Sequence, residues 1–133
     1  MTDHLARLRP GVRRRRAATW DRTGGNDDAV RLEPGESVVL GEDDGPGQVT
    51  HIWCTLLAPD PWWGRSIVLQ AFWDGEEHPS VEVPLGDLFG AGNGLVAPFS
   101  SALLEWAPRD GLSLHSWFPM PFAQGARFEL ENQ

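Results

Sequence analysis

The chain has 133 residues, of which 41% are hydrophobic, enough for one domain with a sizeable buried core. Its 15 glycines and 11 prolines predict many tight turns, which favours an all-β domain over a helical bundle. The net charge of −8 argues against nucleic-acid binding, because phosphate recognition requires a basic surface.

The first 16 residues differ in charge from the rest. They hold six of the eleven arginines and one acid, a net +5, whereas the remainder holds five arginines and eighteen acids, a net −13. We therefore treat 1–16 as a basic arm and 17–133 as one domain, and we expect the arm to lie against an acidic surface of this chain or of a partner. The N-terminus lacks the apolar stretch of a signal peptide and no run reaches membrane-spanning length, so we expect a cytoplasmic protein without membrane contact.

The segment "TWDRTGGNDD" at 19–28 gathers polar side chains around a Gly-Gly turn. Two interpretations are open. Carboxylates accept strong hydrogen bonds from sugar hydroxyls, which would make this segment part of a carbohydrate site. Alternatively, Asp21 pairs with Arg22 while Asn26 and Asp27 close a turn of their own. The candidate substrate-binding residues in this segment are Asp21, Arg22, Asn26, Asp27 and Asp28.

Short strands separated by turn signals follow this segment. "VRLEPGESVVL" at 30–40 predicts a strand, a Pro-Gly turn and a second strand. The acids at 42–44 predict a solvated turn, since they lack the alternating spacing of a calcium-binding loop. The run at 48–57 predicts a strand covered on both faces, in which the lone Cys54 is an inert buried thiol.

The second half of the chain continues the same pattern. A loop at 58–64 precedes a strand at 66–73 that is apolar on both faces, and Asp74-Gly75 predicts a hairpin. The remaining expected elements are a helical turn at 87–89 and strands at 81–85, 111–118 and 126–132. Together these elements predict an all-β fold, an antiparallel β-sandwich of jelly-roll type.

Motifs for a metal, a cofactor or a hydrolase nucleophile are not found in the sequence. The four histidines have no ligand-like spacing, and both His51 and His115 lie mid-strand near tryptophans, which predicts packed structural imidazoles. "GAGNG" at 90–94 lacks the glycine spacing of a dinucleotide-binding loop, and no G-x-S-x-G elbow occurs. We therefore expect neither a metal nor a cofactor.

Trp62 and Trp63 lie together in the predicted loop at 58–64. Sugars present flat C–H faces that stack on indole rings, so both tryptophans are candidate substrate-binding residues. The alternative is that both pack into an adjoining hydrophobic surface of this chain or of another subunit, and the residues alone favour this alternative slightly.

Four stretches of the chain resemble one known family. They are "TWDRTGGNDD", "PGQVTHIW", "AFWDGEEHPSVEVPLGDLFG" and "FPMPFAQGARFELEN", in the order typical of the domain-of-unknown-function family 2961, now glycoside hydrolase family 172. The resemblance covers residues 13–133. It implies a double jelly-roll subunit assembled as trimers or hexamers, and action on α-linked furanosides, including fructofuranosides and D-arabinofuranosides.

The sequence departs from the family pattern at its catalytic segments. The resemblance places the two catalytic glutamates in a "GEGD"-like and a "GTGTEDY"-like segment, and neither occurs in these 133 residues. The chain resembles the first jelly roll alone, so no residue here is assigned as catalytic, and we expect no hydrolysis by this chain by itself. The other functions left open are a non-catalytic carbohydrate-binding or capsid-like assembly module and an inactive remnant.

The resemblance also bears on partners. We expect a furanoside ligand, and either a homo-oligomer or a complementary second jelly-roll chain, because the first half of a double jelly roll packs on the second. The candidate contact surface consists of aromatic residues in or beside predicted loops, and their exposure would disfavour a dilute monomer. These residues are Trp62, Trp63, Trp106 and the run from Phe118 to Phe122.

Overall fold

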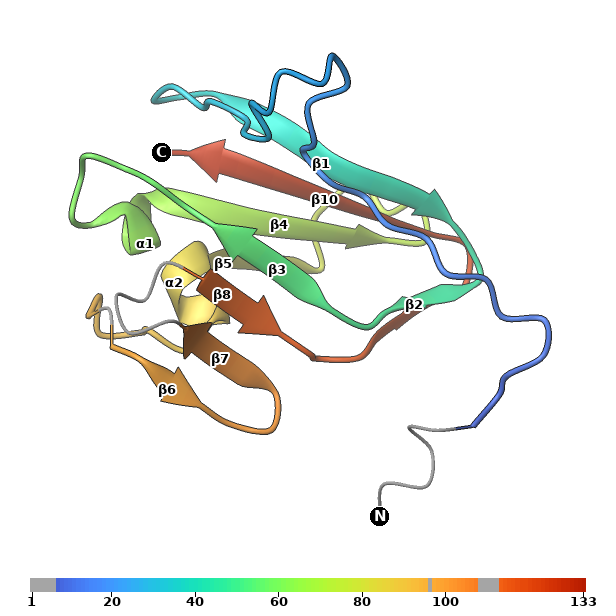
Figure 1. Cartoon of the computed structure of the whole chain (residues 1–133). Coiled ribbons are helices and arrows are strands. Elements are labelled where there is room, and N and C mark those ends of the chain that lie inside the picture. The colour runs from blue at the N-terminus through green and yellow to red at the C-terminus, as the bar shows by residue number, and fades with distance from the viewer. Residues whose placement is uncertain (1–6, 96, 108–112) are drawn as a thin grey trace.

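The computed structural model describes residues 7–95, 97–107 and 113–133. Within these residues there are ten strands and two single-turn helices, and eight of the strands form two facing sheets (Figure 1). The strands are β1 (Ser37–Asp44), β2 (Gly47–Val49), β3 (Ile52–Thr55), β4 (Ile67–Trp73), β5 (Val81–Pro84), β6 (Phe99–Ser100), β7 (Leu104–Ala107), β8 (Ser113–Ser116), β9 (Met120–Phe122) and β10 (Gly125–Asn132). The helices are α1 (Trp63–Ser66) and α2 (Leu85–Leu88).

The strand pairs are antiparallel. One sheet has the order β1-β10-β4-β5, the other has the order β3-β8-β7-β6, and β2 and β9 form a separate ribbon. The pairs β1·β10, β2·β9 and β3·β8 are nested along the chain, as in a long hairpin folded over on itself. The predicted antiparallel β-sandwich is therefore confirmed, and its nested pairs follow the course of a jelly roll.

The hydrophobic core lies between the two sheets. Its largest side chains are Leu69 on β4, Phe89 after α2, Trp106 on β7 and Leu114 on β8, each at most 2% exposed. On the outward face of β4, Phe72 is also buried, because the Arg127 guanidinium lies 4.0 Å from the centre of its ring. The apolar run at 66–73 is thus covered on both faces, as predicted.

The hairpin predicted at Asp74-Gly75 joins β4 to the segment that leads into β5. Both residues have positive φ, 55° and 81°, and the amide of Glu76 donates to the carbonyl of Trp73 at 3.0 Å, as a tight hairpin turn requires. The Asp74 carboxylate accepts three backbone amides, those of residues 123–125, at 2.6–3.2 Å. These bonds lower the pKa of Asp74 and tie the turn to the start of β10.

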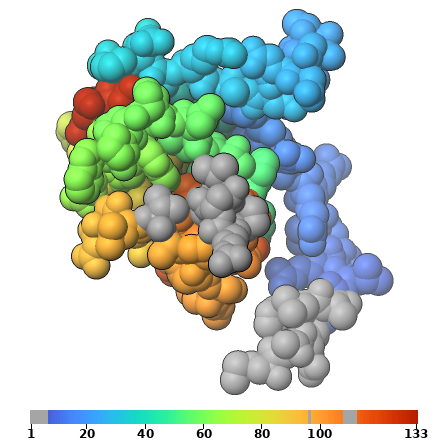
Figure 2. Space-filling model, turned by 60° about the vertical axis from the view of Figure 1, so that its left-hand side comes forward, coloured from blue at the N-terminus to red at the C-terminus, as the bar shows by residue number. Residues whose placement is uncertain are grey.

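The basic arm follows the outer edge of β1. Arg15 forms an ion pair with Asp43, and the methyl group of Ala17 lies against Gly41, where a Cβ would be only 2.6 Å away. At this point the arm lies on an acidic strand of its own chain, one of the two expected arrangements. Figure 2 shows the first described residues of the arm as a limb standing clear of the body.

Three expectations for the first half of the chain are wrong. Residues 30–33 form no strand, and the Leu32 carbonyl accepts instead from the side chain of Asn132 at 2.9 Å. The acids at 42–44 are the end of β1 and not a turn, because each pairs with a residue of β10. The run at 48–57 is divided into β2 and β3, and its Trp53 face is open, with that side chain 51% exposed.

Predictions for the second half of the chain agree closely with the structure. The helical turn expected at 87–89 is present as α2, which begins two residues earlier. The strand expected at 126–132 is β10, whereas the beginning of the one expected at 111–118 lies outside the described residues. Among the described residues, no helix is long and apolar enough to cross a membrane.

Candidate functional site

The loop at 19–28 is organised around the side chain of Asp21. Its Oδ1 accepts the amide of Thr23 at 2.8 Å and the hydroxyl of the same residue at 2.7 Å. Its Oδ2 accepts the amide of Asp27 at 3.3 Å. These hydrogen bonds, the Thr23 hydroxyl first, lower the pKa of the Asp21 carboxyl. Both carboxylate oxygens of Asp21, a candidate sugar-binding residue, therefore accept hydrogen bonds from within the loop.

Asp27 and Asp28 also have partners within the segment. Asp28 Oδ1 accepts the amide of Asp21 at 2.6 Å. Asp27 forms two hydrogen bonds with the guanidinium of Arg31, at 2.9 and 3.1 Å, and they lower the pKa of Asp27. Since Asp27 and Arg31 are both well exposed, their ion pair contributes little to stability.

Arg22 and Asn26 do not take the roles expected for a self-closing turn. Arg22 lies over the ring of Trp20, with its guanidinium carbon 5.7 Å from the ring centre. Asn26 adopts the left-handed backbone at φ 62°, and its side chain is exposed. The loop is thus a self-supporting turn that carries Arg22, Asn26 and one oxygen of Asp28 on its surface.

Replacement of Asp21 tests this organisation. We expect Asp21→Ala to reduce the hydrogen-exchange protection of the Thr23 and Asp27 amides roughly tenfold, because each loses its acceptor. Asp27→Ala, which removes only the exposed ion pair with Arg31, serves as the control and leaves these amides unchanged. Equal loss of protection in both variants, measured by NMR, would contradict the central role of Asp21.

Trp62 and Trp63 take opposite positions at the turn that forms α1. Asp60 Oδ1 accepts the amide of Trp62 at 2.9 Å and begins this turn. Trp62 is 61% exposed and lies against Gly94, where a Cβ would be 3.1 Å from its indole. Trp63 is half-buried and stacks on Trp106, with ring centres 6.0 Å apart and planes 23° apart. Trp62 therefore fits the stacking interpretation, and Trp63 fits the packing interpretation.

The prediction that Trp106 belongs to an exposed aromatic surface is wrong. It is only 2% exposed, since it points inward from β7 and donates its indole Nε1–H to the carbonyl of Phe89 at 2.6 Å. Trp63, which stacks on Trp106, is half-buried. Of the aromatic side chains expected to be exposed, Trp62 and Phe118 are, at 61% and 37%.

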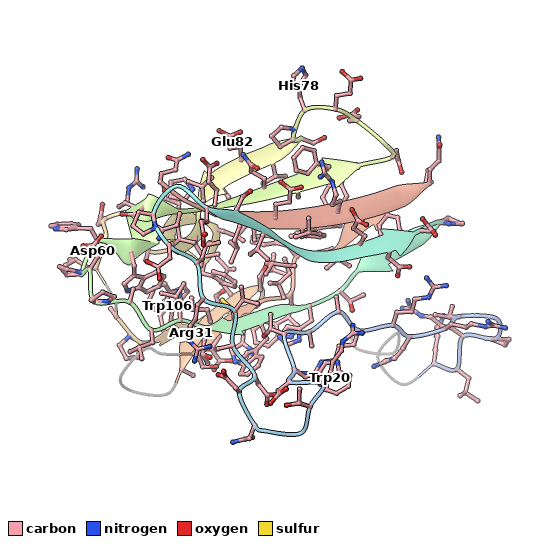
Figure 3. The ribbon with its side chains drawn as sticks, turned by 90° about the horizontal axis from the view of Figure 1, so that it is seen from above. Trp20, Arg31, Asp60, His78, Glu82 and Trp106 are labelled. Atoms are coloured by element: carbon pink, nitrogen blue, oxygen red, sulfur yellow. The ribbon has the colours of Figure 1, made fainter. Side chains whose placement is uncertain are left out.

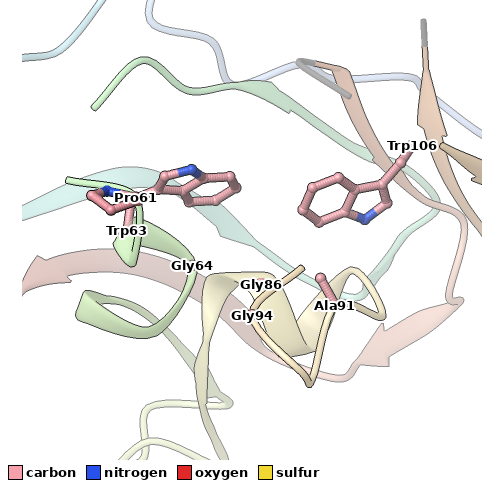
Figure 4. A pocket seen from close by; sticks show the side chains of 7 residues that line it. All are labelled: Pro61, Trp63, Gly64, Gly86, Ala91, Gly94 and Trp106. Atoms are coloured by element: carbon pink, nitrogen blue, oxygen red, sulfur yellow. The ribbon is translucent and has the colours of Figure 1, made fainter. Parts of the chain in front are cut away.

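A small hollow lies between α1, α2 and Trp106 (Figure 4). The indoles of Trp63 and Trp106 lie on its inner side, and glycines bring the two helices together around it. None of its lining residues carries an ionisable side chain. They are Pro61, Trp63, Gly64, Gly86, Ala91, Gly94 and Trp106.

The two sets of candidate residues do not form one pocket. Figure 3 shows Trp20, at the start of the polar loop, well apart from Asp60, at the start of the α1 turn. The loop residues and Trp62 are therefore separate surface features, which residue order alone does not reveal.

The structure brings together residues that were not predicted to meet. His51 Nε2 and His115 Nδ1 lie 3.1 Å apart, and both rings stack on Trp117. The signal in the sequence is the placing of histidines and tryptophans at alternate positions, His51 and Trp53 in one segment and His115 and Trp117 in another. Side chains at alternate positions share one face of a sheet.

Burial affects the ionisation of two groups near this cluster. Partial burial, followed by the neighbouring His115, lowers the pKa of His51. Burial raises the pKa of Cys54 to about 12, so this thiol is inert as expected. In the described part of the chain, no three His, Cys, Asp or Glu side chains are grouped so that they could hold a metal ion.

Comparison with known proteins identifies the family of the chain. No curated protein matches the sequence. A family model described as GH172 domain-like matches residues 23–133, which begin inside the polar loop and include every strand and helix of the sandwich. The chain therefore belongs to the GH172 domain-like family.

Proposed function

We propose that this domain is the non-catalytic jelly-roll part of a glycosidase that acts on α-linked furanosides, such as fructofuranosides or D-arabinofuranosides. The family match over residues 23–133 carries this proposal. Glycosidases of the usual kinds need two carboxyl groups about 5 Å apart for retention or about 6.5–9.5 Å apart for inversion, flanking the bond that breaks. The hollow at α1 and α2 has no carboxylate in its lining, and we assign no catalytic pair to the described residues.

Within such an enzyme, this domain supplies sugar contacts and a surface for its partner. Arg22, Asn26 and Asp28 are exposed on a preformed loop, and such groups suit the hydroxyls of a sugar. Trp62 is exposed and lies against Gly94, and the next residue in the chain, Leu95, is 72% exposed. A second copy or a complementary jelly-roll chain would cover this apolar surface.

The purified 133-residue chain provides the test of the catalytic part. We expect no release of p-nitrophenol from p-nitrophenyl α-D-arabinofuranoside or α-fructofuranoside above the uncatalysed rate, because neither protonation of the leaving group nor attack at the anomeric carbon has an agent here. Turnover that disappears in Glu82→Gln or Glu105→Gln would overturn the proposal. We choose these two glutamates for substitution because they lie on opposite sheets, Glu82 on β5 and Glu105 on β7.

A further inference from the structure

The outward face of the sheet β3-β8-β7-β6 carries a row of aromatic and polar side chains. Trp53 on β3, His115 on β8 and Glu105 on β7 are cross-strand partners, so they lie on the same face. Ser100 on β6 pairs with Glu105 and extends the row to the edge of the sheet. The exposed Trp53 shows that this is the solvent side of the sheet.

The two histidines at this face are fixed side by side. His51 Nε2 and His115 Nδ1 are 3.1 Å apart and share a hydrogen bond, and the two ring planes are nearly parallel, 15° apart. Trp117 stacks parallel to both, with ring centres 5.2 Å from each and planes within 10°. The three rings are therefore nearly parallel and in mutual contact.

Trp53 is held in place by the same network. Its indole Nε1–H donates to Ser113 Oγ at 2.8 Å, and this hydroxyl is also 3.0 Å from His115 Nε2. Although Trp53 is 51% exposed, its orientation is set by a hydrogen bond that a freely moving surface indole would lack. A ring fixed before binding loses little conformational freedom when a ligand stacks on it.

The opposite outward face, on the sheet β1-β10-β4-β5, is different. Two pairs of its polar side chains are in contact: Gln70 donates to Glu82 at 3.4 Å, and Arg127 forms an ion pair with Glu129. Such paired charges are ordinary for a solvated face. The row at Trp53 instead presents a half-exposed indole, held by a hydrogen bond, beside the carboxylate of Glu105.

The chemistry of the row selects the ligand. Indole faces stack on the C–H faces of sugars, and a carboxylate such as that of Glu105 accepts hydrogen bonds from sugar hydroxyls. The described residues of this face include no arginine, and the lowered pKa of His51 favours its neutral form, so these residues offer an anionic ligand no fixed counter-charge. We propose that the face formed by His51, Trp53, Glu105, His115 and Trp117 is a binding surface for a neutral oligosaccharide, distinct from the polar loop and from Trp62.

The size of the face also favours an oligosaccharide over a protein. In the described part of the chain the four strands of this sheet have two to four residues each, which gives a face of roughly 14 Å by 14 Å, or about 200 Å². A standard protein interface buries about 800 Å² on each partner, several times more. That the bound sugar is built of furanose rings rests on the proposed function; that the face binds a sugar does not.

Calorimetric titration of the whole chain with inulin-type fructo-oligosaccharide, arabino-oligosaccharide and cello-oligosaccharide tests the proposal. We expect binding of at least one, and a loss of about tenfold or more in affinity for Trp53→Ala, as for the loss of one anchor side chain. Trp53→Phe keeps a ring face but not the Nε1–H bond to Ser113, so we expect an intermediate affinity. Val39→Ala, at a 48% exposed position on the other sheet, is the control and keeps native affinity.

The outcomes separate this inference from the proposed function. Equal affinity of Trp53→Ala and the native chain, or no binding of any of the three oligosaccharides, overturns the sheet-face site while the family role stays open to the furanoside assay. Binding of the cello-oligosaccharide alone, abolished in Trp53→Ala, supports the sheet-face site and contradicts a furanose-specific role. Urea unfolding of each variant, with native midpoints expected because Trp53 is half exposed, shows that lost affinity is not lost folding.

Discussion

Trp106→Ala is expected to destabilise the domain by about 3–5 kcal/mol, the range found for large aromatic residues removed from a core. Trp106 is 2% exposed and stacks on Trp63, and its Nε1–H is bonded to the Phe89 carbonyl. Removal of the indole leaves a cavity between the two sheets and an unpaired carbonyl. Domains of this kind have total stabilities of only about 5–15 kcal/mol, so a large share is lost.

Two further variants separate the contributions in urea unfolding. Trp106→Phe keeps most of the packing but leaves the buried Phe89 carbonyl without its donor, and we expect a loss of about 1–3 kcal/mol. Trp20→Ala removes an indole that is 58% exposed, so it serves as the matched control with a change within about 0.5 kcal/mol. Similar midpoints for Trp106→Ala and Trp20→Ala would show that Trp106 does not support the core.

Local patterns in the sequence were sufficient for the long central strands. Phe128 and Leu130 alternate with charged residues, and this period of two matches their inward orientation on β10. The continuous apolar run of β4 indicates burial on both faces, and both faces are buried. Asp74-Gly75 predicts a turn with two positive φ values, which only this type of dipeptide adopts readily.

Prediction failed where pairing partners decide the structure. Residues 30–33 have a strand-like pattern, but they precede β1, which begins at Ser37. None of the described strands pairs with them. Trp106 was predicted to lie in or beside a loop because β7 is only four residues long. The side chain of Trp106 is nevertheless the largest in the core. Short strands carry too few residues for a clear period.

The candidate sites, like the strands, were predictable from sequence only where local residues decide the structure. The polar loop at 19–28 was visible from its composition, but composition cannot tell that Asp21 turns both oxygens toward backbone amides of the loop. The contact between His51 and His115 joins residues 64 positions apart. It depends on the β3·β8 register, which places Trp53 opposite His115 and which no local pattern determines.

The approach of α1 to α2 gives the second large effect. We expect Gly86→Ala to destabilise the domain by about 2–3 kcal/mol, in the upper range for overpacked cores. The new Cβ would lie 2.9 Å from the Gly64 carbonyl oxygen and 3.1 Å from its Cα. These are backbone atoms, so relief requires α1 to move as a whole, against the ion pair between Arg65 and Asp87.

Gly64→Ala is the matched control at the other side of the same contact. Its Cβ would be 3.5 Å from the Gly86 Cα, an ordinary contact distance, so we expect a change within about 0.5 kcal/mol. Because Trp62 is the N-cap residue of α1, Gly86→Ala should also shift the amide resonances of residues 62–66, whereas the amide resonances of Trp53 and His115 should not change. If urea unfolding gives equal midpoints for the two alanine variants, the close packing of the helices is not what fixes Trp62 at this end of the sandwich.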